Sequence, residues 1–272
     1  NRLKIPCITI PLSAATCAGW TALSNIYSKN GAFIKDITLR SCPELLIFDH
    51  TFVKKAPSRT LASGVADALA KWYESSMSSG SSDDGFTRHA VQMARVLRDQ
   101  LLIDSYRAYI DSDSIEWTRT IEGCALNAGL IGGIGGAKCR TAVAHSIHNG
   151  LTQLNSRKNP LHGEIVGFGI LVQLKLEERL LKNQLAKQSR IQLSKVLIKL
   201  GIPLSLKGLG LDNISNDDLN YSCIFTCNEL SRMASIPFKI NNKSLYSAII
   251  DTSREGDEMI QKNQSYLMGK LN

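Results

Sequence analysis

Residues 59–76 read RTLASGVADALAKWYESS, and the spacing of their small and apolar side chains predicts a helix. Asp67 lies in the middle of this stretch, directly between Ala66 and Ala68. A carboxylate buried among apolar neighbours is costly unless a partner compensates its charge, and a bound cation is one such partner. Asp67 is therefore a candidate metal ligand, and a carboxylate at the helix surface is the alternative.

Two histidines further along the chain could complete a ligand set. His145 lies in AHSIHNGL over residues 144–151, and His162 lies in LHGEIVGFG over residues 161–169. One carboxylate and two imidazoles leave a fourth coordination position open, as a catalytic divalent-metal site requires. These residues are too far apart in sequence to form a compact metal motif. Spacing alone therefore keeps the alternative that His145 and His148 are satisfied locally on one helix face.

The rest of the chain predicts a small β-rich region followed by helices. Short apolar runs occupy residues 5–10, 21–27, 32–37 and 44–48, and we expect the last to be a buried strand. Asn30 and Gly31 form a hairpin signal between the second and third runs. After Pro57, helices are expected over residues 59–76, 86–109, 114–130, 137–154, 162–184, 187–200, 217–233 and 245–250. We therefore expect the boundary between the β-rich region and the helical region near residue 55.

Composition narrows the class of protein. The 272 residues are 43% hydrophobic, which is enough for one or two domains with a core, and no apolar run approaches the roughly 20 residues that cross a bilayer. Much of the net charge of +8 lies in residues 175–199, where basic and apolar residues alternate. We interpret that segment as a solvated helix face, since no nucleic-acid motif accompanies it. Seven cysteines without a CxxC pair indicate a reducing, cytoplasmic compartment.

One glycine-rich stretch, GLIGGIGG at residues 129–136, could suggest a phosphate-binding loop. No Lys-Ser or Lys-Thr follows it in register, and a predicted helix rather than a strand precedes it. A close-packed junction between helices is therefore the favoured interpretation.

Several segments occur in an order that is specific in combination. They are PCITIP at 6–11, ALSNIY at 22–27, APSR at 56–59, GVADA at 64–68, AHSIHNGL at 144–151, HGE at 162–164, LGIP at 200–203 and IPF at 236–238. Together they resemble the glycerol dehydrogenase branch of the iron-containing (group III) alcohol dehydrogenases. The resemblance implies a mainly α fold, with an all-helical, dehydroquinate-synthase-like domain over residues 56–272. Residues 1–55 would be a β-rich remnant of an α/β dinucleotide-binding domain, whose glycine-rich loop is expected upstream of Asn1.

The resemblance also implies a ligand set. By position, Asp67, His145 and His162 correspond to the family's metal ligands. Lys71 stands where iron-dependent members carry a fourth ligand, a histidine, so the three remaining ligands favour zinc over iron. His148 is expected to relay a proton or to orient the site.

The cofactor and substrate positions follow in the same way. Thr16, Thr21, Leu23 and Asn25 correspond to the segment near the nicotinamide of NAD(P). Cys17 stands where the family usually has an aspartate beside the polyol. A thiol binds a hydroxyl group less strongly than a carboxylate does, which weakens the expectation of glycerol itself as the substrate.

The expected activity is NAD(P)-linked oxidation of a small secondary alcohol or polyol, with hydride transfer from a metal-bound alkoxide. One alternative is a truncated, non-catalytic metal-binding module that self-associates. Another is an enzyme similar to the glycerol-1-phosphate dehydrogenases. Dehydroquinate synthases are less similar, because their carboxylate ligand is a glutamate. Expected partners are a small alcohol and further copies of the chain, without nucleic acid or membrane.

Overall fold

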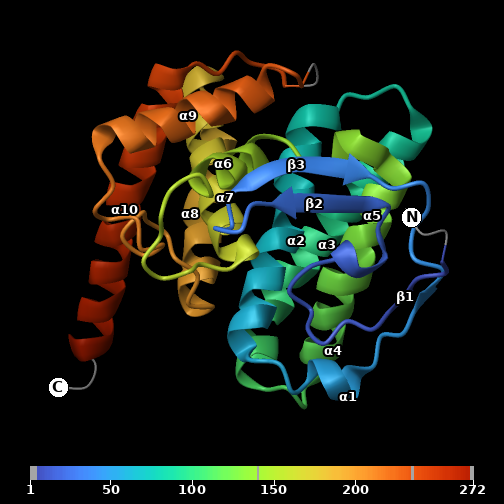
Figure 1. The fold of residues 1–272 in the computed structure, drawn as a ribbon. Coiled ribbons are helices and arrows are strands. Elements are labelled where there is room, and N and C mark those ends of the chain that lie inside the picture. Colours follow the sequence, from blue (N-terminus) through green and yellow to red (C-terminus); the bar gives the residue numbers. More distant parts are fainter. Residues whose placement is uncertain (1–4, 140, 234–235, 270–272) are drawn as a thin grey trace.

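The computed structural model describes residues 5–139, 141–233 and 236–269. Residue 140, which falls within the predicted helix over residues 137–154, lies outside the described residues. Most of the described chain is helical, which confirms the prediction of a mainly α fold after a β-rich start (Figure 1). None of the described helices is long and apolar enough to span a bilayer.

The helices follow one another through most of the chain. They are α1 (His50–Val53), α2 (Ser58–Ser79), α3 (Gly85–Ile110), α4 (Ile115–Glu122), α5 (Ala128–Gly135), α6 (Val143–Leu151), α7 (His162–Leu180), α8 (Gln184–Lys199), α9 (Asn216–Leu230) and α10 (Asn242–Gly269). The turns η1 (Ala18–Trp20) and η3 (Gly136–Cys139) are 3-10 helices, and η2 (Gly123–Asn127) is a π-helical turn that joins α4 to α5. The predicted helix over residues 114–130 is therefore the first part of a longer helical segment.

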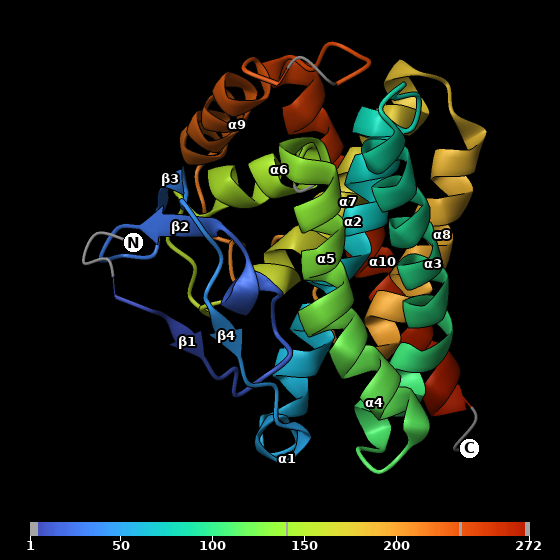
Figure 2. The same ribbon diagram turned by 90° about the vertical axis from the view of Figure 1, so that its right-hand side faces the viewer.

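Two pairs of short strands lie on one side of the helices (Figure 2). The strands β2 (Leu23–Tyr27) and β3 (Phe33–Thr38) form the predicted antiparallel hairpin, with Gly31 in the left-handed region at φ +80°. The strands β1 (Ile8–Thr9) and β4 (Leu45–Leu46) pair in parallel. The prediction of a buried strand over residues 44–48 was wrong. Only two of these residues form the strand. The side chain of Leu45 is 49% exposed, because β1 is the one strand that pairs with β4 in the described part of the chain.

Helix α2 lies at the centre of the helical region and packs mainly against α3 and α7. Small residues let these backbones come close. A Cβ atom at Gly163 of α7 would lie 1.8 Å from the carbonyl oxygen of Ser63 in α2. A Cβ atom at Gly169 would lie 2.5 Å from the carbonyl oxygen of Ala144 in α6. Because α7 contacts both α2 and α6 at backbone distance, it fixes the three helices that carry the candidate ligands.

The helical region has two hydrophobic clusters. One surrounds α2, α3, α5 and α8 and includes Leu69, Leu101 and Ile170. The other surrounds α6, α9 and α10 and includes Ile147 and Phe168. Helix α7 contributes residues to both clusters and therefore joins them.

The segment over residues 175–199 differs from its prediction as a solvated face. Lys175 and Arg190 are both buried and form ion pairs with Glu255 of α10. These ion pairs also explain why α10 continues far beyond the predicted residues 245–250. Its apolar spacing fades, but charged residues keep the helix against α7 and α8.

The glycine-rich stretch over residues 129–136 forms a close-packed junction, as predicted. A Cβ atom at Gly129 would lie 2.5 Å from the indole nitrogen of Trp20, and one at Gly135 would lie 2.4 Å from the sulfur of Cys139. The indole nitrogen of Trp20 donates a hydrogen bond to the carbonyl oxygen of Ala125. This junction holds the N-terminal region against α5.

Candidate metal centre

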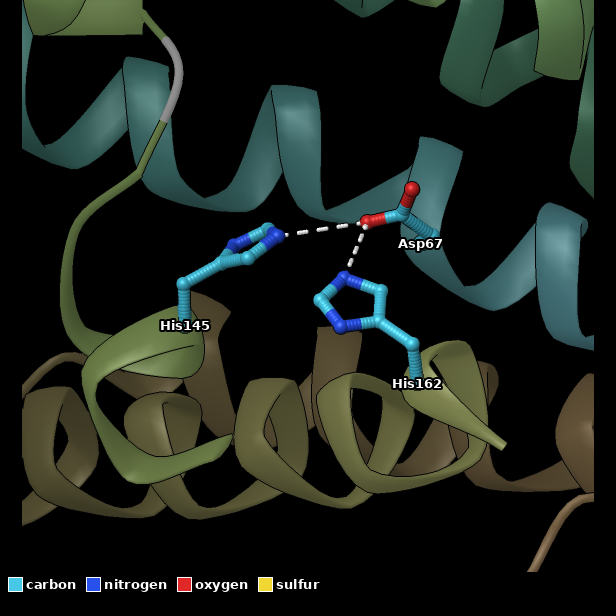
Figure 3. A group of neighbouring side chains, drawn as sticks. All are labelled: Asp67, His145 and His162. Carbon is cyan, nitrogen blue, oxygen red and sulfur yellow. Dashed lines mark hydrogen bonds and ion pairs between the residues drawn. The ribbon is translucent and has the colours of Figure 1, made fainter. Parts of the chain in front are cut away.

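The three residues that the sequence singled out as ligands lie together in the structure (Figure 3). Asp67 comes from the middle of α2, His145 from α6 and His162 from the first residue of α7. The Oδ1 atom of Asp67 lies 3.2 Å from Nε2 of His145 and 3.4 Å from Nε2 of His162. One ligand atom from each residue lies within 4.8 Å of the other two.

The chemistry and spacing of these donors fit a divalent cation. In a tetrahedral site with bonds of about 2.0–2.2 Å, ligand atoms lie roughly 3.3–3.6 Å apart. Both measured separations from Oδ1 of Asp67 are close to this range. A set of two imidazole nitrogens and one carboxylate oxygen suits zinc and also suits iron.

Glu74 holds the ring of His145 from behind. Its Oε2 atom lies 2.5 Å from Nδ1 of His145, and its Oε1 atom accepts hydrogen bonds from the backbone N–H groups of Ala142 and His145 at 2.7 and 3.0 Å. The contact places a proton on Nδ1 of His145, so Nε2, which faces Asp67, is the nitrogen that a cation would take in place of a proton. The sequence reasoning missed Glu74. Its position seven residues after Asp67, on the same face of α2, was the available signal.

His162 is oriented by a hydrogen-bonded chain that runs away from Asp67. Its Nδ1 atom lies 2.9 Å from Nε2 of His148, and Nδ1 of His148 lies 2.9 Å from Oδ1 of Asn149. The amide nitrogen of Asn149 donates to Glu229 at 3.0 Å. Because the amide oxygen accepts, His148 carries its proton on Nδ1 and accepts from His162 at Nε2. This order keeps a proton on Nδ1 of His162, so Nε2, which faces Asp67, is the nitrogen that a bound cation would take in place of a proton.

The electrostatics of the site follow from this arrangement. Burial raises the pKa of the Asp67 carboxyl, but hydrogen bonds from His145 and His162 outweigh it and hold that pKa well below its usual range. Burial lowers the pKa of His145, but the charge of Glu74 and bonds to both carboxylates raise it to about 9. A cation that binds at Nε2 of His145 therefore displaces a proton. Burial and the charge of neighbouring His162 hold the pKa of His148 well below its usual range.

The start of α7 is fixed by an ion pair to the start of α2. Arg59 contacts both carboxylate oxygens of Glu164, at 2.6 and 2.7 Å. Glu164 in turn accepts a hydrogen bond at 2.7 Å from the backbone N–H of Leu161, the residue before the helix. This bidentate contact sets the position of His162 relative to α2.

A cleft of about 540 Å³ opens directly above the three ligands. The predicted cofactor and substrate positions, namely Thr16, Cys17, Thr21, Leu23 and Asn25, all line this cleft. They lie on the N-terminal wall, opposite the helices. His148 lies behind His162 and not among the residues that line the cleft.

Two further residues near the site gave no signal in the sequence. Tyr27 lines the cleft and places its ring edge-to-face against His148, with centroids 6.5 Å apart. Burial raises the pKa of the Tyr27 hydroxyl, so it is neutral near pH 7. Glu229 comes from α9, and only the folded chain brings it to Asn149.

Comparisons with known proteins place the chain in a family. No family model matches the chain. An uncharacterized oxidoreductase of Synechocystis sp. is 47% identical over 252 residues, which cover 93% of this chain and 66% of that protein. Glycerol dehydrogenase of Thermotoga maritima is 30% identical over 260 residues, covering 94% of this chain and 70% of that protein.

A solved structure shows the same likeness. The crystal structure of glycerol dehydrogenase from Schizosaccharomyces pombe matches with a TM-score of 0.84 at 26% identity, covering 97% of this chain and 67% of that one. The chain thus spans about two thirds of the length of the relatives that it matches. It belongs to the glycerol dehydrogenase branch of the iron-containing alcohol dehydrogenases, a family of metal-dependent, NAD-linked oxidoreductases.

Proposed function

We propose that the chain carries the metal-binding and substrate-binding side of an NAD(P)-linked dehydrogenase, which interconverts a small secondary alcohol or polyol with its carbonyl compound. One observation carries the proposal. Two imidazoles and one carboxylate, from three different helices, converge at the base of a cleft of about 540 Å³. A cleft of this size accommodates a small alcohol beside a nicotinamide ring.

Asp67, His145 and His162 would hold the metal ion, with zinc preferred and iron the alternative. When bound there, a divalent cation supplies Lewis-acid polarisation of the substrate oxygen and lowers the pKa of its hydroxyl group. Glu74 keeps the ring of His145 oriented for this role, and His148 does the same for His162.

The N-terminal wall of the cleft would receive the cofactor. Thr16, Thr21, Leu23 and Asn25 all line the cleft. The hydroxyl and amide groups of Thr16, Thr21 and Asn25 would bind the carboxamide of the nicotinamide, and Leu23 would give its ring an apolar contact. When bound against this wall, the nicotinamide would supply a hydride acceptor for the carbinol carbon of the substrate, and solvent would take up the hydroxyl proton. The largely apolar lining of the cleft limits the access of water to the reacting atoms.

The proposal also concerns the domains of the chain and its oligomeric state. Residues 1–55 would belong to a nucleotide-binding domain and residues 56–272 to a helical metal-binding domain. We further propose that the chain forms a homo-oligomer. Exposed apolar side chains along α3, including Phe86, Val96 and Ile103, support this, and light scattering coupled to size-exclusion chromatography tests it.

The test of the activity combines metal binding with turnover. The full-length protein, loaded with zinc, is supplied with NAD and 1,2-propanediol or glycerol, and NADH formation is followed by absorbance. The His162→Ala variant is expected to lose zinc binding and NADH formation together. His89→Ala is the matched control, because His89 is exposed on α3 and does not line the cleft.

Two results would decide against this function. Turnover that survives both EDTA and His162→Ala would exclude a role for the three ligands in the reaction. Zinc binding without NAD binding or turnover would favour the alternative of a non-catalytic metal-binding module.

A further inference from the structure

A buried lysine lies in the wall of the cleft beside the three ligands. Lys71 is 6% exposed and lines the same cleft as Asp67, His145 and His162. It follows Asp67 by one turn of α2, so the two side chains are neighbours on one helix face. Its positive charge acts on the ligands, because it contributes to lowering the pKa of both Asp67 and His145.

The charge of the cleft is set by few groups. Among the described residues that line it, Asp67 carries the single carboxylate and Lys71 the single ammonium group. Other polar positions there, such as Thr16, Ser24 and Asn25, carry hydroxyl and amide groups. Glu74 is buried behind His145 and lies outside the lining. With the buried carboxylate of Glu74 counted beside that of Asp67, a divalent cation next to Lys71 would leave one positive charge in excess, which a neutral polyol does not offset.

We propose that Lys71 selects substrates that carry a carboxylate on the carbon next to the reacting group, that is, 2-hydroxy acids and their 2-oxo counterparts. This inference rests on the proposed function, and it names the substrate class of the same site. The reaction would be oxidation of the 2-hydroxy acid by NAD(P)+ to the 2-oxo acid, with NAD(P)H and one proton as the other products.

The geometry favours a carboxylate at that carbon. Side chains one helical turn apart start about 5–6 Å from each other, so an anion bound to Lys71 lies beside a group held near Asp67. A substrate that spans both positions needs its charge close to the reacting oxygen. A single lysine is a point charge that suits one carboxylate, whereas phosphate sites commonly gather several N–H donors.

Lys71 could instead serve only to compensate the buried charges of Asp67 and Glu74. The two roles predict different effects of Lys71→Met, which removes the charge and keeps an unbranched side chain. A purely structural role predicts that zinc and substrate binding weaken together. The selecting role predicts opposite effects, because the charge of Lys71 attracts a carboxylate and repels a metal cation.

The test uses calorimetric titration of the full zinc-loaded chain with lactate and with 1,2-propanediol, which share a carbon skeleton and differ in charge. Wild type is expected to bind lactate more tightly than the diol. Lys71→Met should weaken lactate binding roughly 10- to 100-fold, the range for a hydrogen bond to a charged group, and leave the diol within about twofold. Its zinc affinity should be unchanged or higher. Lys71→Arg retains the charge and should keep the preference for lactate.

The control variant tests specificity, and each contrary outcome overturns a different part of the proposal. Lys55→Met removes an exposed lysine outside the cleft and should change neither titration. Equal binding of lactate and the diol by zinc-loaded wild type would overturn the selection by Lys71 and leave the proposed dehydrogenase intact. Tighter, Lys71-dependent binding of glycerol 1-phosphate than of lactate would overturn the assignment to carboxylates. Failure of wild type to bind zinc would overturn the proposed function itself, and this inference with it.

Discussion

The two regions that meet at the cleft bury their apolar side chains to very different extents. In the helical region, residues 58–269, Val65, Leu69 and Phe168 are completely buried. In residues 5–57, Ile5, Ile8, Ile10 and Leu12 are between 49% and 66% exposed. The helical region therefore has a core of its own and holds all three candidate ligands, while residues 5–57 form the opposite wall of the cleft. The ligand geometry depends on helix packing, and the wall depends on fewer contacts.

Alanine substitutions at two glycines of α2 and α7 compare how much stability is lost by a clash between helices and by a clash with the N-terminal region. Gly163→Ala places a Cβ atom against the backbone of Ser63 where α2 and α7 cross, so we expect it to lower the free energy of unfolding by about 3 kcal/mol. Gly64→Ala places a Cβ atom 1.9 Å from the carbonyl oxygen of Ala14, in the N-terminal region. We expect the more exposed N-terminal region to yield to this clash more readily than the crossing of two helices does, so a smaller loss of about 1 kcal/mol is expected. Urea denaturation measures both.

The control for this pair is Gly133→Ala on α5, where a Cβ atom meets nothing within 4 Å. It should leave stability unchanged or raise it by up to about 1 kcal/mol, since alanine favours the helix. Equal losses for the two test variants would contradict the division of the molecule into a self-supporting helical region and a dependent wall.

Glu74→Gln tests whether helix packing alone orients the ligands. The amide can still accept from the backbone of Ala142 and His145, but it presents an N–H group to Nδ1 of His145 and shifts the ring proton to Nε2. Zinc affinity is expected to fall about 10- to 100-fold, measured by competition with a chelator. Glu177→Gln is the matched control, a buried glutamate on α7 that is bonded to Gln173. Unchanged zinc affinity in Glu74→Gln would show that the packing of α2, α6 and α7 suffices.

The ion pairs of Glu255 give a pH-dependent probe of the helical region far from the cleft. Burial raises the pKa of Glu255, but contacts with Lys175 and Arg190 outweigh it and hold the pKa below 4.5. The stabilisation by this carboxylate is therefore present above about pH 4.5 and is lost as the pH falls through the lower folded value. Glu255→Gln should be less stable than wild type by about 2 kcal/mol at pH 7, and the difference should shrink as the pH falls through the folded pKa.

Urea denaturation across this pH range measures the difference between wild type and Glu255→Gln. Zinc affinity at pH 7 should not change, because the ion pairs join α7, α8 and α10 away from the ligands. A difference that grows on acidification would have the wrong sign for a paired carboxylate.

The smallest effect is expected where the N-terminal region meets a surface loop. Lys54, just after α1, forms an ion pair with Asp113, whose side chain is 82% exposed. Exposed ion pairs contribute roughly 0–1 kcal/mol, so Lys54→Met should change stability by less than that amount. A loss above about 2 kcal/mol in thermal or urea unfolding would show that this region is held more firmly than its exposure suggests.

Sequence reasoning identified the elements whose signals are local. The helical spacing of small and apolar side chains predicted α2, and Asn30 with Gly31 predicted the hairpin. The convergence of Asp67, His145 and His162 was expected mainly from their order and context in a family resemblance. Spacing alone could not bring together helices that are distant in the chain.

The remaining features depend on tertiary contacts. The partner of His145 is on α2, and the chain that begins at His162 ends at Glu229 on α9, so neither contact follows from local sequence. Lys175 and Arg190 look like solvated residues in the sequence because the carboxylate that pairs with them comes from α10. Strand β4 is exposed, although its apolar run predicted a buried strand. An apolar run indicates that a segment tends to be buried, but it does not identify the element that would cover it.

The central claim is that one carboxylate and two imidazoles, carried by three helices, hold a single divalent cation. X-ray absorption of the protein loaded with one equivalent of zinc tests it directly. We expect a first shell of nitrogen and oxygen atoms at about 2.0–2.2 Å, with the scattering of two imidazole rings, and the loss of this shell together with the bound zinc in His162→Ala. A shell that contains sulfur at about 2.3 Å, or an imidazole signal that His162→Ala leaves unchanged, would contradict the claim.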